Sequence, residues 1–360
     1  MNIENTLNTA IKTLTQFNIQ NANLDSEILL AKIIGKDRNY IILNSKEHLN
    51  QKYLFRFNNL IERRKKGEPV AYLTRKKEFW KNDFYVDQNV LVPRPDTELI
   101  VEEVIKFSKK KFKLQILDIG TGSGCILLSL LKEIPSFYGI GIDISKKSIN
   151  VSKYNAKMLN LTNRVKFYNS DVDKFKIGKY DIVVSNPPYI ELLKLKYLDK
   201  DLCKFEPKIA LNGGIDGFSA IKKVVHETSF LIKRNGKFFL EIGYNQKNKV
   251  KAILTKKGFY INKVLKDYGN IDITYKINFK LIESLINYLK LKSQGITSQR
   301  NFLISLGILE RAEIISKNLP FSKKADIYFR LKRLIDKNEM GELFKVMLIT
   351  NKKTNFNLGF

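Results

Sequence analysis

Leu114-Gln115-Ile116-Leu117-Asp118-Ile119 runs directly into Gly120-Thr121-Gly122-Ser123-Gly124, and this stretch decides the fold. The mostly apolar first part predicts a buried strand, and the three glycines predict a tight turn whose backbone can approach a ligand closely. The apolar residues that follow, up to Lys132, predict a helix whose first turn offers free N–H groups to a carboxylate or a phosphate. Strand, glycine turn and helix together are typical of a nucleotide-type cofactor site.

Strand-like and helix-like segments alternate downstream of this turn. Apolar runs predict strands at Tyr138–Ile142, Val165–Tyr168, Asp181–Ser185 and Lys237–Ile242, with a closing pair at Tyr260–Val264 and Ile271–Ile277. Helices are predicted between them, at 146–159, 217–232 and 246–257. Strands that are apolar throughout and separated by helices indicate an α/β protein with a parallel, doubly wound sheet.

Acidic residues stand where these strands end. Asp143 follows the second strand, nineteen positions after Gly124, and an acid there can accept both hydroxyls of a ribose. A dinucleotide is an alternative ligand, but Asp118 would repel a pyrophosphate and can instead bind an ammonium group, as S-adenosylmethionine carries. Asp171, after the third strand, is expected to bond an adenine amine while Val172 packs on the ring; an ordinary turn aspartate is nearly as well supported.

Asn186-Pro187-Pro188-Tyr189 follows the fourth strand. A planar amide or amine nitrogen is a poor nucleophile, so an enzyme must hold its N–H bonds and shift electron density onto it. The Asn186 side chain offers one carbonyl acceptor and the backbone carbonyl of Pro187 a second, since prolines fix the path and add no N–H. Tyr189 offers an aromatic face over the planar group. The tetrapeptide therefore predicts methyl transfer to a planar nitrogen by positioning.

The bulk composition limits the protein's class. The chain has 360 residues, 44% of them hydrophobic, which predicts a globular protein of two or three domains. The sequence has only two cysteines, and we recognise neither a signal peptide nor an apolar run long enough to span a membrane, so we predict a cytoplasmic protein. Its two histidines lie far apart in the sequence, which argues against a metal site. The net charge of +28 suits a polyanion, but the charge is mostly lysine spread along the chain, which favours compositional drift.

Several further segments resemble the release factor glutamine N5-methyltransferases. Gly67-Glu68-Pro69-Val70-Ala71-Tyr72-Leu73-Thr74, followed by Glu78-Phe79-Trp80, is similar to that family's linker hairpin. Val92-Pro93-Arg94-Pro95-Asp96-Thr97-Glu98 resembles its interdomain motif, in which ribosomal protein glutamine enzymes and nucleic-acid amine enzymes usually differ. Phe205-Glu206-Pro207, Ala210-Leu211 and Gly213-Gly214-Ile215-Asp216-Gly217 also fit. The resemblance covers about residues 1 to 276.

This resemblance implies a helical docking domain at 1–85, where Asp25 is expected to cap the second helix, and a class I seven-stranded, Rossmann-like methyltransferase domain at 86–277. It implies S-adenosylmethionine as cofactor and, as substrate, the glutamine of a Gly-Gly-Gln loop in peptide chain release factors. The substrate-binding residues implied are Asn186, Pro187, Pro188 and Tyr189. With the acids above, the expected cofactor-binding residues are Asp118, Gly120, Thr121, Gly122, Ser123, Gly124, Asp143, Asp171, Val172 and Asn186.

Three residues depart from the family's usual pattern. Arg75 replaces a glycine after Leu-Thr, Ile273 replaces a frequent arginine, and Val172 replaces a common aromatic residue. We therefore expect a different turn at Arg75 and weaker stacking on the adenine. None of the three touches the predicted methyl-transfer chemistry.

The chain beyond residue 277 has a different likeness. Thr297-Ser298-Gln299, Arg311-Ala312-Glu313 and Glu339 to Val346 resemble the C-terminal end of the family related to the mitochondrial complex I assembly arginine methyltransferase. Residues 278–360 are accordingly interpreted as an α-rich fused fragment without an active site of its own. The alternatives to the leading hypothesis are a nucleic-acid amino-methyltransferase acting on adenine or guanine, a ribosomal protein glutamine methyltransferase and a non-catalytic scaffold.

Overall fold

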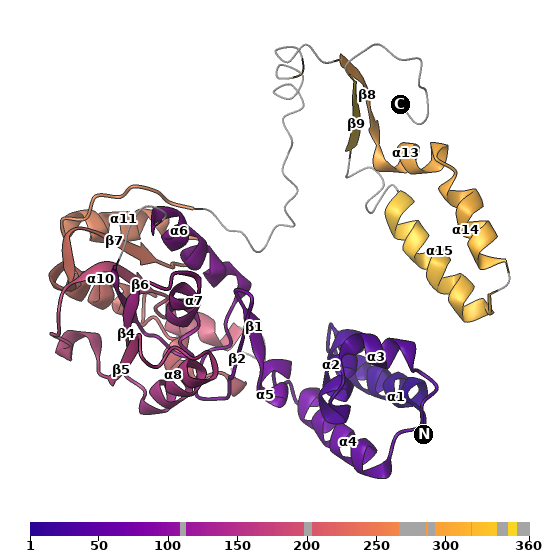
Figure 1. Ribbon diagram of the computed structural model, residues 1–360, viewed down its shortest axis with the longest axis horizontal. Coiled ribbons are helices and arrows are strands. Elements are labelled where there is room, and N and C mark those ends of the chain that lie inside the picture. The colour runs from indigo at the N-terminus through magenta and orange to yellow at the C-terminus, as the bar shows by residue number, and fades with distance from the viewer. Residues whose placement is uncertain are drawn as a thin grey trace. The chain divides into compact units, whose positions relative to one another are not determined.

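The structure is a computed structural model that describes residues 1–108, 113–197, 204–265, 286, 292–317, 319–336 and 345–350. The chain divides into two compact units, Met1–Asp272 and Ile273–Phe360 (Figure 1). The first unit contains both predicted ligand-binding motifs. We describe each unit by itself.

The N-terminal part of the first unit is a small helical bundle. Its helices are α1 (Ile3–Gln16), α2 (Ala22–Ile34), α3 (Arg38–Leu43), α4 (Gln51–Lys65) and α5 (Val70–Thr74). Apolar side chains at helical spacing, among them Leu14, Leu30 and Phe57, form its core. The helical prediction is confirmed, but the cap is not Asp25. Asn21 precedes α2, and Asp25 lies inside the first turn, where its buried carboxylate accepts a 2.8 Å hydrogen bond from Arg64 of α4.

A short hairpin follows the bundle. Strands β1 (Lys77–Phe79) and β2 (Asn82–Phe84) pair antiparallel, as the linker-hairpin resemblance predicts. Phe79 and Phe84 pack edge to face in the core of the sheet domain. The hydroxyl of Tyr72, in α5, donates a 2.6 Å hydrogen bond to the carbonyl of Val90. The linker is therefore packed against the sheet domain rather than free of it.

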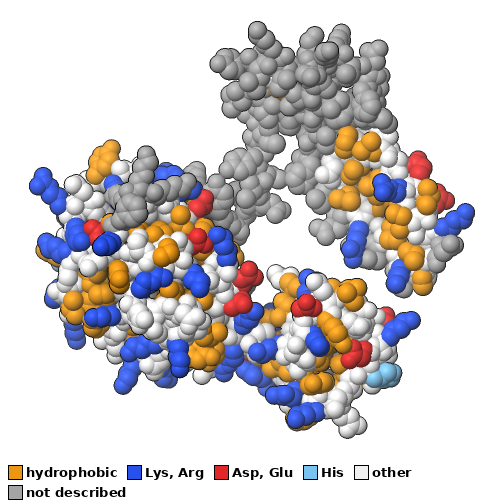
Figure 2. Space-filling view, viewed as in Figure 1, with side chains coloured by type: hydrophobic (Ala, Val, Ile, Leu, Met, Phe, Trp, Pro, Cys, Tyr) orange, Lys and Arg blue, Asp and Glu red, His pale blue; other side chains and the backbone are white. Residues whose placement is uncertain are grey.

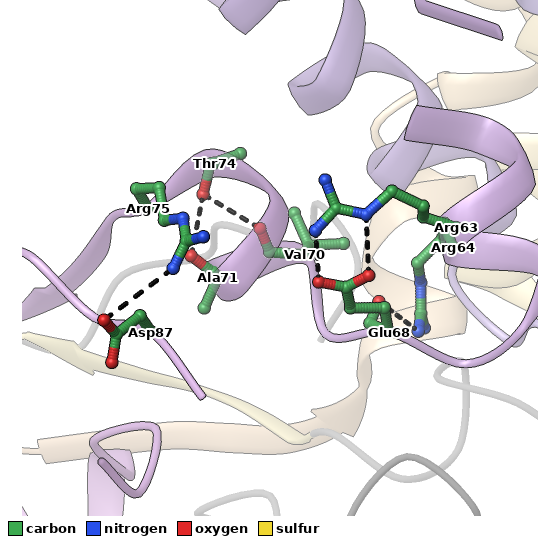
Figure 3. Close-up of polar contacts among 8 residues, drawn as sticks. All are labelled: Arg63, Arg64, Glu68, Val70, Ala71, Thr74, Arg75 and Asp87. Carbon is green, nitrogen blue, oxygen red and sulfur yellow. Dashed lines mark hydrogen bonds and ion pairs between the residues drawn. The ribbon is translucent and has the colours of Figure 1, made fainter. Parts of the chain in front are cut away.

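Arg75 takes a backbone conformation that glycine adopts more readily than any other residue. It ends α5 in the left-handed region, with φ +58° and ψ +29°, and its side chain reaches toward Asp87, with Nη1 3.9 Å from Oδ2 (Figure 3). In the same view Arg63 and Arg64 both bond Glu68, and the Thr74 hydroxyl donates to the carbonyl of Val70. The turn thus contains a strained residue that bears a side chain, and the expectation that it differs from the family's usual turn stays a prediction.

We expect the free energy of unfolding of Arg75→Gly to exceed that of Arg75→Ala by about 1 kcal/mol, because only glycine adopts this conformation without strain. Arg75→Gly should therefore unfold at a higher denaturant concentration. Both variants lose the half-exposed pair with Asp87, which contributes little, so their comparison isolates the backbone. Urea titrations followed by circular dichroism measure the difference. Equal stabilities would mean that Arg75 is not strained.

The sheet of the first unit has five parallel strands in the order β5-β4-β3-β6-β7. They are β3 (Gln115–Ile119), β4 (Tyr138–Asp143), β5 (Val165–Asn169), β6 (Tyr180–Ser185) and β7 (Ile232–Leu240). The chain winds outward from β3 to β5, then returns to the other side of β3 for β6 and β7. This reversal between β3 and β6 confirms the doubly wound α/β fold and places a ligand crevice at the carboxyl ends of those two strands.

The predicted closing pair of strands is the exception. Tyr260–Val264 has no regular secondary structure, and Tyr260 is 87% exposed, too solvated for the inside of a sheet. Ile271–Ile277 and Ile273 lie outside the described residues. The described part of the sheet therefore has five strands.

Helices cover both faces of the sheet. Side chains alternate along each strand: Ile116 and Val184 pack with α6 (Glu98–Ser108), α7 (Cys125–Glu133) and α8 (Lys146–Met158), whereas Leu117 and Val183 pack with α10 (Ser219–Leu231). Helix α11 (Lys247–Lys256) packs against α10. Four 3-10 turns complete the described part of this unit: Pro95–Thr97, Val172–Lys174, Leu192–Tyr197 and Lys208–Ala210.

Most of the described residues of the second unit are helical. It contains β8 (Lys292–Ser298), α13 (Gln299–Ser305), α14 (Ile308–Ser316), α15 (Phe321–Ile335) and β9 (Lys345–Thr350), with β8 and β9 antiparallel. The Gln299 side chain donates a 3.0 Å hydrogen bond to the carbonyl of Leu334, at the end of α15. The described residues agree with the α-rich character expected of this segment, and its likeness to the end of another methyltransferase family stays a prediction.

Candidate active site

The glycine turn leaves the carboxyl end of β3. Gly120 and Gly124 have φ angles of +74° and +81°, which only glycine adopts readily. A side chain at Gly120 would meet nothing within 4 Å, so this residue is required for the backbone path rather than for space. The backbone N–H groups of Gly120 and Thr121 each donate a 2.9 Å hydrogen bond to the carbonyl of Ile142, at the end of β4. The turn is thus bonded to the neighbouring strand.

Asp143 closes the other side of the turn. Its Oδ2 accepts the Gly122 N–H at 3.0 Å, and its Oδ1 accepts the Ser145 N–H at 2.8 Å. Burial raises the pKa of this carboxyl, and the two backbone donors oppose the shift. The structure therefore brings together the glycine turn and the acid that the sequence assigned to a ribose. The carbonyl of Ser123 accepts from Asn155 of α8, which fixes the end of the turn.

Asp118 is the residue most suited to a cationic ligand group. It is 1% exposed; its Oδ2 accepts a 2.8 Å hydrogen bond from the Thr121 hydroxyl, while its Oδ1 is buried without a hydrogen-bond partner among the described residues. Burial, reinforced by the charge of Asp143, raises the pKa of Asp118 to about 7 against the opposing bond from Thr121. A buried carboxylate oxygen without a donor is costly unless a ligand supplies one, so the residues fit the ammonium group of S-adenosylmethionine.

Asp171 and Val172 are placed differently from each other. Asp171 lies just before the 3-10 turn Val172–Lys174, and its Oδ2 pairs with Lys223 Nζ of α10 at 2.6 Å. Val172 is buried against Ile119 and Ile142, the residues on either side of the glycine turn. Val172 therefore stands where it can pack on a bound ring, whereas the Asp171 carboxylate already has a partner. The bond from Asp171 to an adenine amine stays a prediction.

The Asn-Pro-Pro-Tyr segment begins where β6 ends. Ile119 and Ser185 are paired in register, and the Ser185 hydroxyl donates a 2.8 Å hydrogen bond to the Ile119 carbonyl. This pairing brings the two sequence motifs to adjacent strand ends, as the doubly wound fold requires. The half-buried Asn186 donates its Nδ2 to the Thr97 hydroxyl at 3.1 Å, and Thr97 is 4% exposed. Because the NH₂ group of the Asn186 amide bonds Thr97, the carbonyl of the same amide is left to bind a ligand.

The chain after Asn186 is fastened by a second loop. Pro187 is buried and Pro188 half-buried. The carbonyl of Tyr189 accepts a 3.0 Å hydrogen bond from Gln246, which bonds the Gly217 carbonyl through the same nitrogen. An added Cβ at Gly213 would come within 2.8 Å of the Tyr189 backbone. The glycine-rich segment 213–217 therefore has a structural explanation, because it lets two loops approach closely and hold Tyr189 in place.

Glu241 and Thr97 are site residues that the sequence reasoning did not assign. Glu241 follows β7 directly, and its N–H donates a 3.0 Å hydrogen bond to the Ser185 carbonyl. The Tyr189 hydroxyl donates to Glu241 Oε1 at 3.3 Å. Burial and the neighbouring carboxylate raise the pKa of Tyr189, so its hydroxyl keeps its proton. A polar residue directly after a buried strand was the available signal, as at Asp143 and Asn186.

Fold and site together define a methyltransferase of the Rossmann-like class, and known proteins match it in both parts. The family described as PrmC N-terminal domain matches residues 5–74, and the methyltransferase small domain matches residues 96–200. A release factor glutamine methyltransferase of Clostridium acetobutylicum is 38% identical over 275 residues, covering 76% of this chain and 96% of that protein. Its counterpart in Buchnera aphidicola subsp. Schizaphis graminum is 38% identical over 272 residues, covering 76% and 97%.

The chain belongs to the release factor glutamine methyltransferase family. A bifunctional methyltransferase of Rickettsia bellii is also similar, 31% identical over 347 residues that cover 88% of this chain and 62% of that protein. The match to a longer, bifunctional relative agrees with a fusion in this chain. It leaves the origin of residues 278–360 as a prediction.

Proposed function

We propose that this chain transfers the methyl group of S-adenosylmethionine to the side-chain amide nitrogen, N5, of a glutamine in peptide chain release factors. The observation that carries the proposal is the placement of Asn186 and Asp118 at the ends of adjacent strands, in a chain of this family. One end suits a cofactor's ammonium group and the other suits an amide. Both lie at the carboxyl edge of the sheet, where doubly wound proteins bind their ligands.

The cofactor-binding role falls to the ends of β3 and β4. Asp118 Oδ1 would accept the ammonium group, and Asp143 the ribose hydroxyls, exchanging its bonds from Gly122 and Ser145. The glycine turn allows the backbone to approach, and Val172 packs on the adenine. The bound cofactor supplies an electrophilic methyl group on a sulfonium sulfur. The cofactor-binding set therefore remains the one expected from the sequence, with Asp171 its weakest member because of Lys223.

The amide-binding role falls to the end of β6. With Nδ2 held by Thr97, the Asn186 carbonyl accepts one N–H of the substrate glutamine, and the Pro187 carbonyl accepts the other. Two acceptors orient the nitrogen lone pair and favour the positive charge that develops on nitrogen as the methyl group arrives. Tyr189 covers the planar amide. Because Gln246 and the loop 213–217 hold Tyr189, this geometry is formed before the substrate binds.

Residues 1–85 are proposed as the docking domain, 86–277 as the catalytic domain and 278–360 as an extension without its own site. A groove of about 970 Å³ between the helical bundle and the linker supports the first assignment. More basic than acidic side chains line it, among them Lys32, Lys36 and Lys77. Such a groove suits an acidic stretch on a folded protein substrate.

The basic charge does not favour a nucleic-acid substrate over this proposal. On the face drawn in Figure 2, Lys and Arg side chains are scattered among apolar and uncharged ones over each described part. A nucleic-acid site is expected to gather them into one continuous track. Within the described part of the chain, no helix has the length and apolar character needed to cross a membrane. A cytoplasmic location is part of this proposal.

The test is to incubate the purified chain with S-adenosylmethionine labelled in its methyl group and, separately, a release factor, DNA and tRNA. We expect label on the release factor alone, and its loss when the loop glutamine is replaced by alanine. Label on nucleic acid alone would contradict the substrate while keeping the chemistry of Asn186. Cofactor binding without transfer to any of the three would favour a scaffold.

A further inference from the structure

Glu241 lies between three groups of the amide-binding site. Its Oε1 accepts from the Tyr189 hydroxyl at 3.3 Å, and its Oε2 is buried without a hydrogen-bond partner in the described part of the chain. The polar side chains of Thr97, Tyr189 and Asn186 oppose the rise that burial causes in its pKa and so favour its charged form. A buried carboxylate oxygen without a bond is rare enough to require an explanation.

Thr97 has the complementary need. Its oxygen already accepts the Nδ2 hydrogen of Asn186, so its own proton must go to another acceptor. Thr97 is 4% exposed, which leaves little water to take that proton. Glu241 lies at the same strand end, because its N–H bonds the carbonyl of Ser185, the residue before Asn186, and its Oε2 is the buried acceptor that still lacks a donor. The hydroxyl and the carboxylate thus complete each other.

We propose that Glu241 is a positioning residue that fixes which way the Asn186 amide faces. An ionised carboxylate only accepts hydrogen bonds, so Thr97 must donate to Glu241 and can only accept from Asn186. The amide therefore keeps its NH₂ on Thr97 and presents its carbonyl to the substrate. This inference rests on the proposed function, in which that carbonyl accepts a glutamine N–H.

The charge of Glu241 decides which group of the Asn186 amide faces the substrate. A neutral group at this position can donate to Thr97, whose proton then turns toward Asn186 and draws the amide carbonyl to itself. Asn186 would then present NH₂ to the substrate amide, donor against donor. The titratable groups that face the Glu241 carboxylate come from three elements. They are Asp96 on the turn before α6, Tyr189 on the loop after β6 and Cys125 at the start of α7. Burial and the charge of Asp96 raise the pKa of Glu241, so protonation abolishes the orientation as pH falls through that value.

The kinetic test uses Glu241→Gln, which keeps the shape and removes the charge. At saturating cofactor we expect kcat to fall about 100-fold, the order seen when one transition-state hydrogen bond is lost, with the cofactor Kd unchanged. The kcat of Thr97→Val should fall by a similar factor, whereas Thr97→Ser should keep most of the activity. The double variant Glu241→Gln/Thr97→Val should be no slower than either single variant. Glu227→Gln is the matched control, a buried glutamate paired with Lys176 outside the site. The fall of kcat at low pH should disappear in Glu241→Gln.

The second test needs no turnover. In the free protein labelled with ¹⁵N-asparagine, the Asn186 side-chain NH₂ signal, assigned by its absence in Asn186→Ala, should shift in Glu241→Gln and not in Glu227→Gln. An unchanged signal, or a Glu241→Gln enzyme with wild-type kcat, would overturn the proposal. If the wild type methylates no release factor, the proposed function fails, and the signal alone still decides the role of Glu241.

Discussion

Replacing Asn186 with alanine is expected to slow methyl transfer to the release factor by about 10²- to 10³-fold, because the variant lacks the carbonyl that accepts the substrate N–H. The cofactor Kd should change by less than about threefold, since Asp118 and the glycine turn, which carry most of the binding, belong to other strands. Transfer of labelled methyl under single-turnover conditions measures the rate, and calorimetric titration with the cofactor measures the affinity.

Two further variants make this result specific. Asn245→Ala removes an exposed asparagine on the neighbouring loop and should leave kcat unchanged. Asn186→Asp keeps the shape but adds a charge beside the buried Glu241, and it cannot donate to Thr97 unless protonated. We expect it to be nearly as slow as Asn186→Ala. A fast Asn186→Ala enzyme would sink the two-acceptor mechanism and leave Asn186 a structural role.

The centre of the sheet could be predicted from the sequence because its strands are buried on both faces. Most residues of β3 and β6 are apolar and buried, and Ile182 and Val183 of β6 are fully buried on opposite faces. The same argument located the ligand site, since parallel strands bring their carboxyl ends to one edge. The prediction is wrong at Tyr260–Val264, where apolar side chains alternate with Asn262 and Lys263 and both Tyr260 and Val264 are exposed. Composition alone does not distinguish a strand from an exposed apolar loop.

The residues that the sequence could not place are those whose role depends on long-range partners. Asp171 pairs with Lys223 and Asp25 with Arg64, across gaps that no local pattern encodes. In the sequence Thr97 is only one position of the interdomain motif, and its contact with Asn186 spans 89 positions. Glu241 has meaning only once β7 is known to lie beside β6. A turn or cap can be predicted locally, whereas the partners of a polar side chain require the topology.

Asp118→Asn is expected to weaken cofactor binding by 100-fold or more, because it removes the buried charge that faces the ammonium group. In the wild type the affinity should fall as pH drops, by roughly tenfold between pH 8 and pH 6, since the free carboxyl has its pKa raised to about 7 and must be ionised to bind. Asp118→Asn should lose this dependence. Calorimetric titrations at several pH values measure both effects.

The same substitution should stabilise the free protein. A folded-state pKa near 7, above the unfolded value, means that wild-type stability declines as pH rises from about 4 through 7. Asparagine cannot ionise, so the free energy of unfolding of Asp118→Asn should exceed that of the wild type by roughly 4 kcal/mol at pH 8 and by only about 1 to 2 kcal/mol at pH 5. Asp181→Asn is the control: it removes a carboxylate that pairs with Lys233 at the amino end of β6, away from the site, and should leave the cofactor affinity unchanged. If Asp118→Asn binds the cofactor as the wild type does, the unpaired oxygen does not hold the ammonium group, and another residue must.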